Sequence, residues 1–477
     1  MQQRLSPSPN LRRVMLCAGL LVGLAGCEIG DPFSKPAITA PAAWDAASNT
    51  ALAEWPDTSW WRGFASAELD GLMRQAESNN RDLAAALARI RQAEASARIA
   101  GAALLPTLGA DGGAGRSWSP SSSSTSSTRT ASSGRVVRNS FDLGLTAGYQ
   151  VDLFGGNRAG SDAALERLAA SRYDRETVAL TLHADLATAY FQLLSVRDRI
   201  RLAEDTLRNA EDVLAVLERQ RQLGVASELE VAQQRNSVAS QRATIPALRQ
   251  SERETLTAIA LLLGRPPQGF AISTTSLDAL ALPAVKAGLP SALLARRPDI
   301  RKAEADLRAA NRDIAVAQAA RLPSLDLTMG AGLQSSALHT LLQPQSALYS
   351  LAASLTAPLF QGGRLEGQED LNRARYQELA ETYGKAAITA FGDVEDALTS
   401  TANAAERYTY AREAFDQARE AYRIVEARYR AGTVPFLNLL DAQRTVFQAN
   451  DALAQALLGR YTALVDLYKA LGGGWTE

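Results

Sequence analysis

Residues 141–153, Phe-Asp-Leu-Gly-Leu-Thr-Ala-Gly-Tyr-Gln-Val-Asp-Leu, alternate strictly between two kinds of side chain. The odd-numbered positions are apolar, whereas the even-numbered positions are Asp, Gly, Thr and Gln. Because successive side chains of a β-strand point to opposite faces, this segment predicts a long strand with one uncharged face. Three further segments show the same alternation, most weakly the Gly-rich first one. The four predicted strands cover residues 107–118, 138–153, 324–335 and 346–358.

Long strands with one face free of charge are typical of a transmembrane barrel, which has lipid outside and water inside. A half-buried sheet of a soluble protein is the alternative. Four strands cannot close a membrane barrel, since single-chain barrels begin at about eight, and open strand edges cannot lie in lipid. Two pooled copies would give eight strands and a plugged interior, whereas three would give twelve and a lumen wide enough for a channel. We expect the trimer.

Two very long helices are predicted over residues 157–223 and 364–431, neither of which contains proline. From Leu182 to Leu217 apolar residues recur at alternating steps of four and three, which is the heptad pattern of packed helices. At 1.5 Å per residue such a helix is roughly 100 Å long, more than any compact domain needs. A fibrous coiled coil is the alternative, and the strands argue against it.

The chain repeats its own pattern once. Residues 105–108, Leu-Pro-Thr-Leu, correspond to residues 322–325, Leu-Pro-Ser-Leu, and each copy is expected to run helix, strand, strand, very long helix, helix. We therefore predict two repeats, at 71–264 and 288–472, joined by a linker at 265–287 that contains Pro and Gly.

The N-terminus has the pattern of an export signal. Arg12 and Arg13 precede an apolar run at residues 14–25, which is too short to span a bilayer. The run ends in Leu-Ala-Gly-Cys, and small residues before Cys27 resemble the lipobox of bacterial lipoproteins. We therefore expect a signal peptide at 1–26; a plain signal peptide with an incidental cysteine is the alternative.

The lipobox resemblance implies that Cys27 becomes the first residue and carries covalent N-acyl and S-diacylglycerol lipid. Glu28, which follows the cysteine, favours the outer membrane over retention at the inner one. An N-terminal periplasmic segment is expected at 27–70 and a short tail at 473–477. We expect no cofactor besides this lipid.

Composition excludes several classes of function. The chain has 477 residues, with 50 Lys and Arg against 51 Asp and Glu, so it lacks the basic excess of a nucleic-acid binder. Only 2 His and 2 Cys are present, which excludes a disulfide framework and a His- or Cys-rich metal site. His183 and His339 are isolated, and no Gly-rich loop ends in Gly-Lys-Ser/Thr. We expect no enzyme, no metal and no nucleic-acid partner.

Several features together resemble one known family. They are the cysteine after the apolar run, the duplicated plan, Trp60-Trp61, and the segments 79–83, 296–300 and 439–444. They resemble the outer membrane factor family, the TolC-like exit channels of tripartite efflux pumps, in the NodT-type lipoprotein branch. The resemblance implies a homotrimer with a twelve-stranded barrel in the outer membrane of a Gram-negative bacterium, continuous with a long periplasmic helical barrel. It also implies three partners: outer-membrane lipid, a periplasmic adaptor (membrane fusion) protein and an inner-membrane transporter of the resistance-nodulation-division (RND) class.

The resemblance further implies a gate at the periplasmic end, where the family narrows its pore. Leu437 and Asp441 match that constriction, and in a trimer each would form a ring. A leucine ring would exclude water, and an aspartate ring would impose a local negative field. Arg428, Tyr429 and Arg430 precede the turn and are expected to hold neighbouring helices. The alternative is an ordinary packed leucine with solvated charges.

Four aspartates are expected on the water-filled side of the strands, and we see no Lys or Arg there in the clear alternation. They are Asp111, Asp142, Asp152 and Asp326. This pattern predicts a lumen that prefers cations.

The sequence therefore predicts a mainly α protein with transmembrane β-strands that passively conducts drugs or other small molecules out of the cell. Two alternatives remain: the exit duct of a type I protein secretion system, and a non-channel lipoprotein scaffold in the periplasm. The Ser/Thr-rich segment 119–134 is expected to be a flexible outward loop, and a glycosylated or ligand-binding tract is the alternative.

Overall fold

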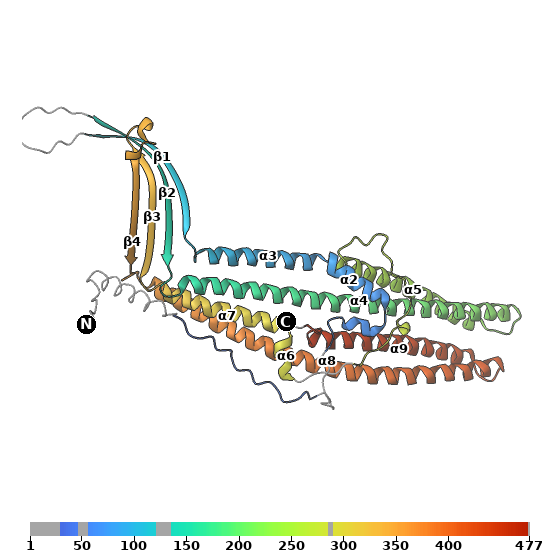
Figure 1. Ribbon diagram of the computed structural model, residues 1–477. Helices are drawn as coiled ribbons and strands as arrows, with labels where there is room; N and C mark the ends of the chain where they lie inside the picture. The colour runs from blue at the N-terminus through green and yellow to red at the C-terminus, as the bar shows by residue number, and fades with distance from the viewer. Residues whose placement is uncertain (1–28, 46–55, 121–134, 285–289, 476–477) are drawn as a thin grey trace, which may run out of the picture. The chain divides into compact units, whose positions relative to one another are not determined.

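The computed structural model describes residues 29–45, 56–120, 135–284 and 290–475 (Figure 1). Each half of the chain runs helix, strand, strand, long helix, helix, as predicted. The helices are α2 Ala67–Asn79, α3 Arg81–Ala102, α4 Gly156–Gln222, α5 Glu228–Leu262, α6 Pro290–Arg296, α7 Pro298–Ala319, α8 Arg364–Arg430 and α9 Phe436–Ala470. The strands are β1 Thr107–Pro120, β2 Arg135–Val151, β3 Ser324–Ser335 and β4 Ala347–Thr356. Short 3-10 turns are η1 Trp60–Phe64, η2 Leu277–Ala279, η3 Leu338–Thr340 and η4 Pro344–Ser346.

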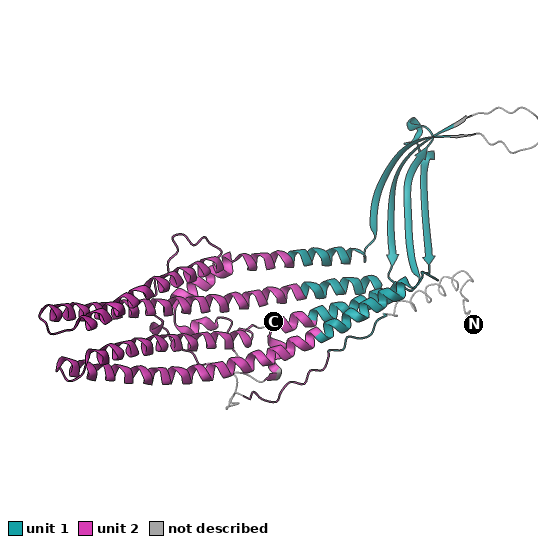
Figure 2. Cartoon of the chain, turned by 180° about the vertical axis from the view of Figure 1, so that it is seen from behind, with its two compact units in different colours: residues 1–35, 91–169, 305–381 teal, residues 36–90, 170–304, 382–477 magenta. Residues whose placement is uncertain are grey.

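The chain forms two compact units (Figure 2). Unit 1 comprises residues 1–35, 91–169 and 305–381, and it contains the sheet together with the helix ends that lead into and out of the strands. Unit 2 comprises residues 36–90, 170–304 and 382–477, and it contains the remaining helices.

The four strands of unit 1 form one antiparallel sheet in the order β1-β2-β3-β4. Directly opposed residues share a face, and the pairing is regular from Thr107↔Gly148 through Asp142↔Gln334 to Asp326↔Ser354. The period-two alternation therefore sorts the whole sheet into one polar face and one apolar face.

The long helices come in matched pairs. Helices α4 and α8 each have 67 residues, and α5 and α9 each have 35. The predicted heptad positions Leu186, Leu193, Ala203 and Leu217 of α4 are buried. In the described part of the chain, no helix is both long and apolar enough to cross a bilayer.

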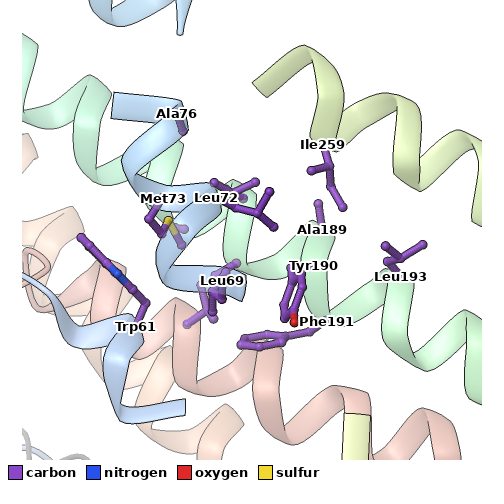
Figure 3. Packing of buried hydrophobic residues seen from close by; sticks show 14 of the residues in the cluster. Trp61, Leu69, Leu72, Met73, Ala76, Ala189, Tyr190, Phe191, Leu193 and Ile259 are labelled. Carbon is purple, nitrogen blue, oxygen red and sulfur yellow. The ribbon is translucent and has the colours of Figure 1, made fainter. Parts of the chain in front are cut away.

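Unit 2 has an aromatic core. Phe64 of η1 packs against Phe191 of α4, with ring centroids 4.8 Å apart, and Trp60 stacks on Tyr468 of α9 at 4.7 Å. Leu69 of α2 belongs to the same buried cluster (Figure 3). This core joins the N-terminal segment to helices of both repeats, including α4 and α5 of the first and α9 of the second.

Each repeat begins with a side chain that holds the end of its last helix. Asn80 donates from Nδ2 to the Leu262 carbonyl at 2.8 Å, at the end of α5. Arg297, at the matching place in the second repeat, donates to the Ala470 carbonyl at the end of α9 and pairs with Asp393 of α8 at 2.8 Å. The duplication thus extends to the contacts that close each repeat.

The linker between the repeats is held by Glu68 of α2. Its carboxylate accepts hydrogen bonds from the Ser273 amide (2.6 Å), the Ser273 hydroxyl (2.7 Å) and the Thr274 amide (2.9 Å). Burial opposes the charge of Glu68, but hydrogen bonds from Thr274 and Ser273 outweigh it and lower the pKa to about 2.

We expect Glu68→Gln to reduce the free energy of unfolding by about 2 kcal/mol at pH 7, because the bonds to a charged acceptor are lost. A lowered folded-state pKa contributes stability above the ordinary value of 4.5, and the contribution disappears as the pH falls through about 2. The difference between wild type and variant in denaturant titrations should therefore shrink over that pH range. Glu218→Gln, which breaks an exposed pair with Arg235, should cost under about 1 kcal/mol. Equal losses in the two variants would contradict the role of Glu68.

Candidate functional site: the polar sheet face and the helical tip

The polar face of the sheet carries three of the four predicted aspartates within strands. Asp111 lies on β1, Asp142 on β2 and Asp326 on β3. In the register, Asp142 faces Gly113 on one side and Gln334 on the other. The face therefore combines carboxylates with amide and hydroxyl groups, which suits contact with water.

Glycines make room for two of these carboxylates. A Cβ atom at Gly113 would lie 2.7 Å from both Asp142 carboxylate oxygens, and one at Gly144 would lie 3.2 Å from Asp111 Oδ2. Thr146 also donates from its hydroxyl to Asp111 Oδ1 at 3.3 Å. Because Gly113 and Gly144 have no Cβ atom, the carboxylates of Asp142 and Asp111 can lie close to the sheet.

The structure places Asp152 differently from the other three. It lies one residue beyond β2, and its carboxylate accepts the Asn157 amide (3.1 Å) and the Arg158 amide (2.8 Å) in the first turn of α4. A carboxylate at a helix start satisfies free amides and is favoured by the helix dipole. Asp152 therefore caps the long helix.

Sequence reasoning missed one cation on the polar face. Strand β2 begins at Arg135, six residues before the clear alternation at 141–153. Arg138 therefore lies within the strand, shares the face of Asp142 and lies opposite Ser117. The polar face thus has a positive charge toward the β1–β2 connection and negative charges below it. Continuing the polar positions backwards in steps of two from Asp142, through Ser140, would have found Arg138.

The helical tip of unit 2 consists of two similar turns. After α4, the Val225 amide donates to the Gln220 carbonyl at 2.9 Å; after α8, the Thr433 amide donates to the Arg428 carbonyl at 3.0 Å. These bonds reach carbonyls left free at a helix end and reverse the chain tightly.

Leu437 and Asp441 lie one helical turn apart near the start of α9, and both side chains are exposed. Their spacing of four puts them on the same side of the helix. Leu437 is 58% exposed although Leu439, two residues on, is 3% exposed and packed. Leu437 and Asp441 are thus exposed side by side at the tip, and their role in a gate stays a prediction.

The three residues before the turn have different surroundings. Arg430 pairs with Glu426 of its own helix at 2.8 Å, and Arg428 is exposed. Tyr429 packs against Phe436, with ring centroids 5.8 Å apart. Burial, and the nearby charge of Glu230, raise the pKa of Tyr429.

Tyr429 belongs to a small apolar cluster that joins all four helix tips. Its buried members are Leu217, Val231, Phe436 and Leu439. Beside it lies a groove of about 1000 Å³ between α4 and α8. The groove walls include Val213, Val216 and Val225 with the carboxylates of Asp212 and Glu230. The tip thus offers a groove lined by both apolar and polar side chains, with carboxylates in excess over the one cation, Arg430.

Cys27, the predicted lipidation site, lies outside the described residues, and so does most of the 119–134 segment. Within the described residues, no group of three or more His, Cys, Asp or Glu is arranged to hold a metal ion.

Comparisons with known proteins identify this arrangement. The family model described as outer membrane efflux protein matches residues 72–265 and 289–473. The pyoverdine export outer membrane protein OpmQ of Pseudomonas aeruginosa is 45% identical over 87% of each chain. The probable efflux pump outer membrane protein TtgC of Pseudomonas putida is 33% identical over 95% of this chain and 94% of its own. The solved outer-membrane channel OprN superposes with a TM-score of 0.85 at 29% identity, covering 94% of this chain and 100% of that one.

The chain belongs to the outer membrane efflux protein family. It is an outer-membrane efflux channel of a Gram-negative bacterium, as the sequence predicted. The predicted fold class is confirmed as well: a mainly helical, internally duplicated chain that contributes four strands, in the fold of these trimeric barrel channels.

Proposed function

We propose that this channel acts as a homotrimer that provides the exit from a tripartite efflux pump. The observation that carries the proposal is the four-stranded sheet with two free edges, β1 and β4, and one predominantly apolar face. Free edges cannot lie in lipid, so β1 of one copy must pair with β4 of the next. Three copies give twelve strands, enough to enclose a lumen.

The polar sheet face then lines the lumen, and the apolar face contacts lipid. Lipid on Cys27 would anchor the chain at the periplasmic surface of the same membrane. The described chain begins two residues later, and it runs along unit 1: Asn311 of α7 donates to the Asp31 carbonyl (3.1 Å), and Arg308 lies over the Phe33 ring (5.4 Å). These contacts support a fixed path for the segment that follows the anchor.

A periplasmic adaptor would dock at the helical tip and connect it to an inner-membrane transporter of the RND class. The groove between α4 and α8 supports this assignment, because an amphipathic helix with basic flanks fits a groove whose valines lie beside the carboxylates of Asp212 and Glu230. Leu437 and Asp441 would close the pore until the adaptor binds.

The cargo is proposed from the order of similarity. The relative at 45% identity is named for pyoverdine export, whereas the relative at 33% is named for an efflux pump. We therefore propose a cargo of the pyoverdine type. The names of these two relatives, which refer to pyoverdine export and to an efflux pump, favour small-molecule efflux over a protein-secretion duct.

The test is a deletion strain complemented with the wild-type gene or with an empty vector. We expect the deletion to lower the pyoverdine-type compound in the medium and raise it in the periplasm, with full recovery on complementation. Unchanged compound together with increased drug sensitivity would move the cargo to drugs. A loss of secreted protein alone would favour the secretion duct.

The lumen is expected to prefer cations. In a trimer Asp111, Asp142 and Asp326 give nine carboxylates against three Arg138 guanidinium groups. In planar bilayers with a salt gradient, the reversal potential should indicate cation selectivity, and changing all three aspartates to Asn should abolish it. Asp152→Asn is the matched control, since that carboxylate caps α4 and should affect selectivity little. Anion selectivity of the wild type would refute the prediction.

A further inference from the structure

The apolar face of the sheet carries one charged side chain among those that the structure describes, Arg116 of β1. The register pairs it with Asn139 of β2, on the same face as Leu143 and Leu145. The other described side chains of this face in all four strands are uncharged. They are Leu, Ala, Gly, Phe, Tyr, Val, Met, Asn, Ser and Trp.

Arg116 lies toward one particular end of the sheet. It is four residues from the end of β1 at Pro120, where the connection to β2 begins, whereas the opposite end of β1 follows α3. In the proposed orientation the helices lie in the periplasm, so Arg116 is near the outer leaflet. An outward Arg costs about 2–4 kcal/mol at the bilayer midplane and about 0–1 kcal/mol near an interface, which agrees with this height.

The side chains around Arg116 are typical of a membrane–water interface, but none of the described ones is an acidic partner for its charge. Its guanidinium carbon is 5.6 Å from the ring centroid of Trp118, two residues further out on the same face. Tryptophan is enriched where membranes meet water. No described acidic side chain forms an ion pair with Arg116, and the three strand aspartates lie on the opposite face. Among the described residues, Arg116 thus has no acidic partner and is free to bind an anion from outside the sheet.

We propose that Arg116, with Trp118 and Asn139, forms a binding site on the outside of the barrel for the phosphorylated headgroup of an outer-leaflet lipid. A guanidinium group binds phosphate oxygens in a bidentate manner, and the Asn139 amide can donate to the same oxygens. The indole would cover the adjoining acyl or sugar surface. This inference rests on the proposed trimer and its orientation.

The test is native mass spectrometry of purified trimers that are titrated with a phosphorylated glucosamine-based glycolipid or with the same glycolipid after its phosphates are removed. We expect the wild type to retain the phosphorylated form, and Arg116→Gln to bind it about tenfold more weakly. The affinity of Arg116→Lys should lie between those of the wild type and Arg116→Gln, since lysine keeps the charge but loses the bidentate geometry of the guanidinium group. The wild type, Arg116→Gln and Arg116→Lys should each bind the dephosphorylated lipid no more tightly than the phosphorylated one.

Arg138→Gln is the matched control. Arg138 lies opposite Ser117, next along β1 from Arg116, at nearly the same height but on the polar face. The Arg138→Gln trimer should therefore bind the phosphorylated lipid as tightly as the wild type does. Equal binding by wild type and Arg116→Gln, or an equal loss in Arg138→Gln, would overturn the lipid site while the trimer and its efflux function stand. Absence of a wild-type trimer would instead overturn the proposed function and this inference with it.

Discussion

Replacing Asp441 by alanine should raise the single-channel conductance of the reconstituted trimer by about twofold or more, and should make cells leak antibiotics inward. The side chain is exposed near the start of α9, so three copies would place three carboxylates around the tip. At the proposed gate, such a ring would bind cations and repel anions. Removing the Asp441 carboxylates would widen the pore at the tip and remove their negative field. Leu437→Ala should raise the conductance further, because water could then enter the pore at that level.

The control for this prediction is Asp416→Ala on α8, which removes an exposed carboxylate of the same helical hairpin away from the tip. Its conductance should equal that of the wild type. If Asp441→Ala also conducts like the wild type, with trimers of normal heat stability, the gate does not lie at Asp441.

The second large effect concerns the two glycines that close the repeats. Gly264 and Gly472 follow α5 and α9 with φ of +66° and +86°, a left-handed backbone that favours glycine. A Cβ atom at Gly264 would lie 2.9 Å from the Asn79 carbonyl carbon, and one at Gly472 would lie 2.8 Å from the Arg296 carbonyl oxygen. These backbone atoms belong to the last residues of α2 and α6, just before α3 and α7 begin, so they cannot move aside.

Gly264→Ala and Gly472→Ala should therefore each cost about 4 kcal/mol or more and deplete folded channel from the outer membrane. Gly269→Ala provides the matched control: its φ is +72°, but nothing lies within 4 Å of the added Cβ atom. It should cost only about 1–2 kcal/mol. The measurements are the amount of heat-modifiable trimer and its dissociation temperature. A Gly264→Ala trimer as stable as Gly269→Ala would contradict the close approach.

The elements of this fold were predictable because each has a strong period. The alternation at 141–153 and the heptads from Leu182 to Leu217 identified the strands and the long helices, and the observed α4 and α8 begin and end within one residue of the predicted ranges. Their equal lengths follow from the duplication.

Parts of the candidate site were not predictable, since they depend on where strands end and on contacts far apart in sequence. Asp152 continues the alternation of β2, yet β2 ends one residue earlier, and helix capping takes the carboxylate. The tip cluster of Tyr429 and Phe436 with Leu217 and Val231 requires both hairpins to meet. Arg199 of α4 pairs with Asp451 of α9 at 2.6 Å across 252 residues, which no local pattern indicates.

The most direct test of the central claim is photocrosslinking in living cells from the helical tip. A photoreactive residue at Val225, which is 75% exposed after α4, and another at Ala431, exposed after α8, sample both turns. Captured proteins are identified by mass spectrometry. The account predicts capture of a periplasmic adaptor, recovery of an RND-type transporter with it, and crosslinked trimers of the chain itself. Capture of a secretion ATPase, or of no adaptor and no trimer, would contradict it.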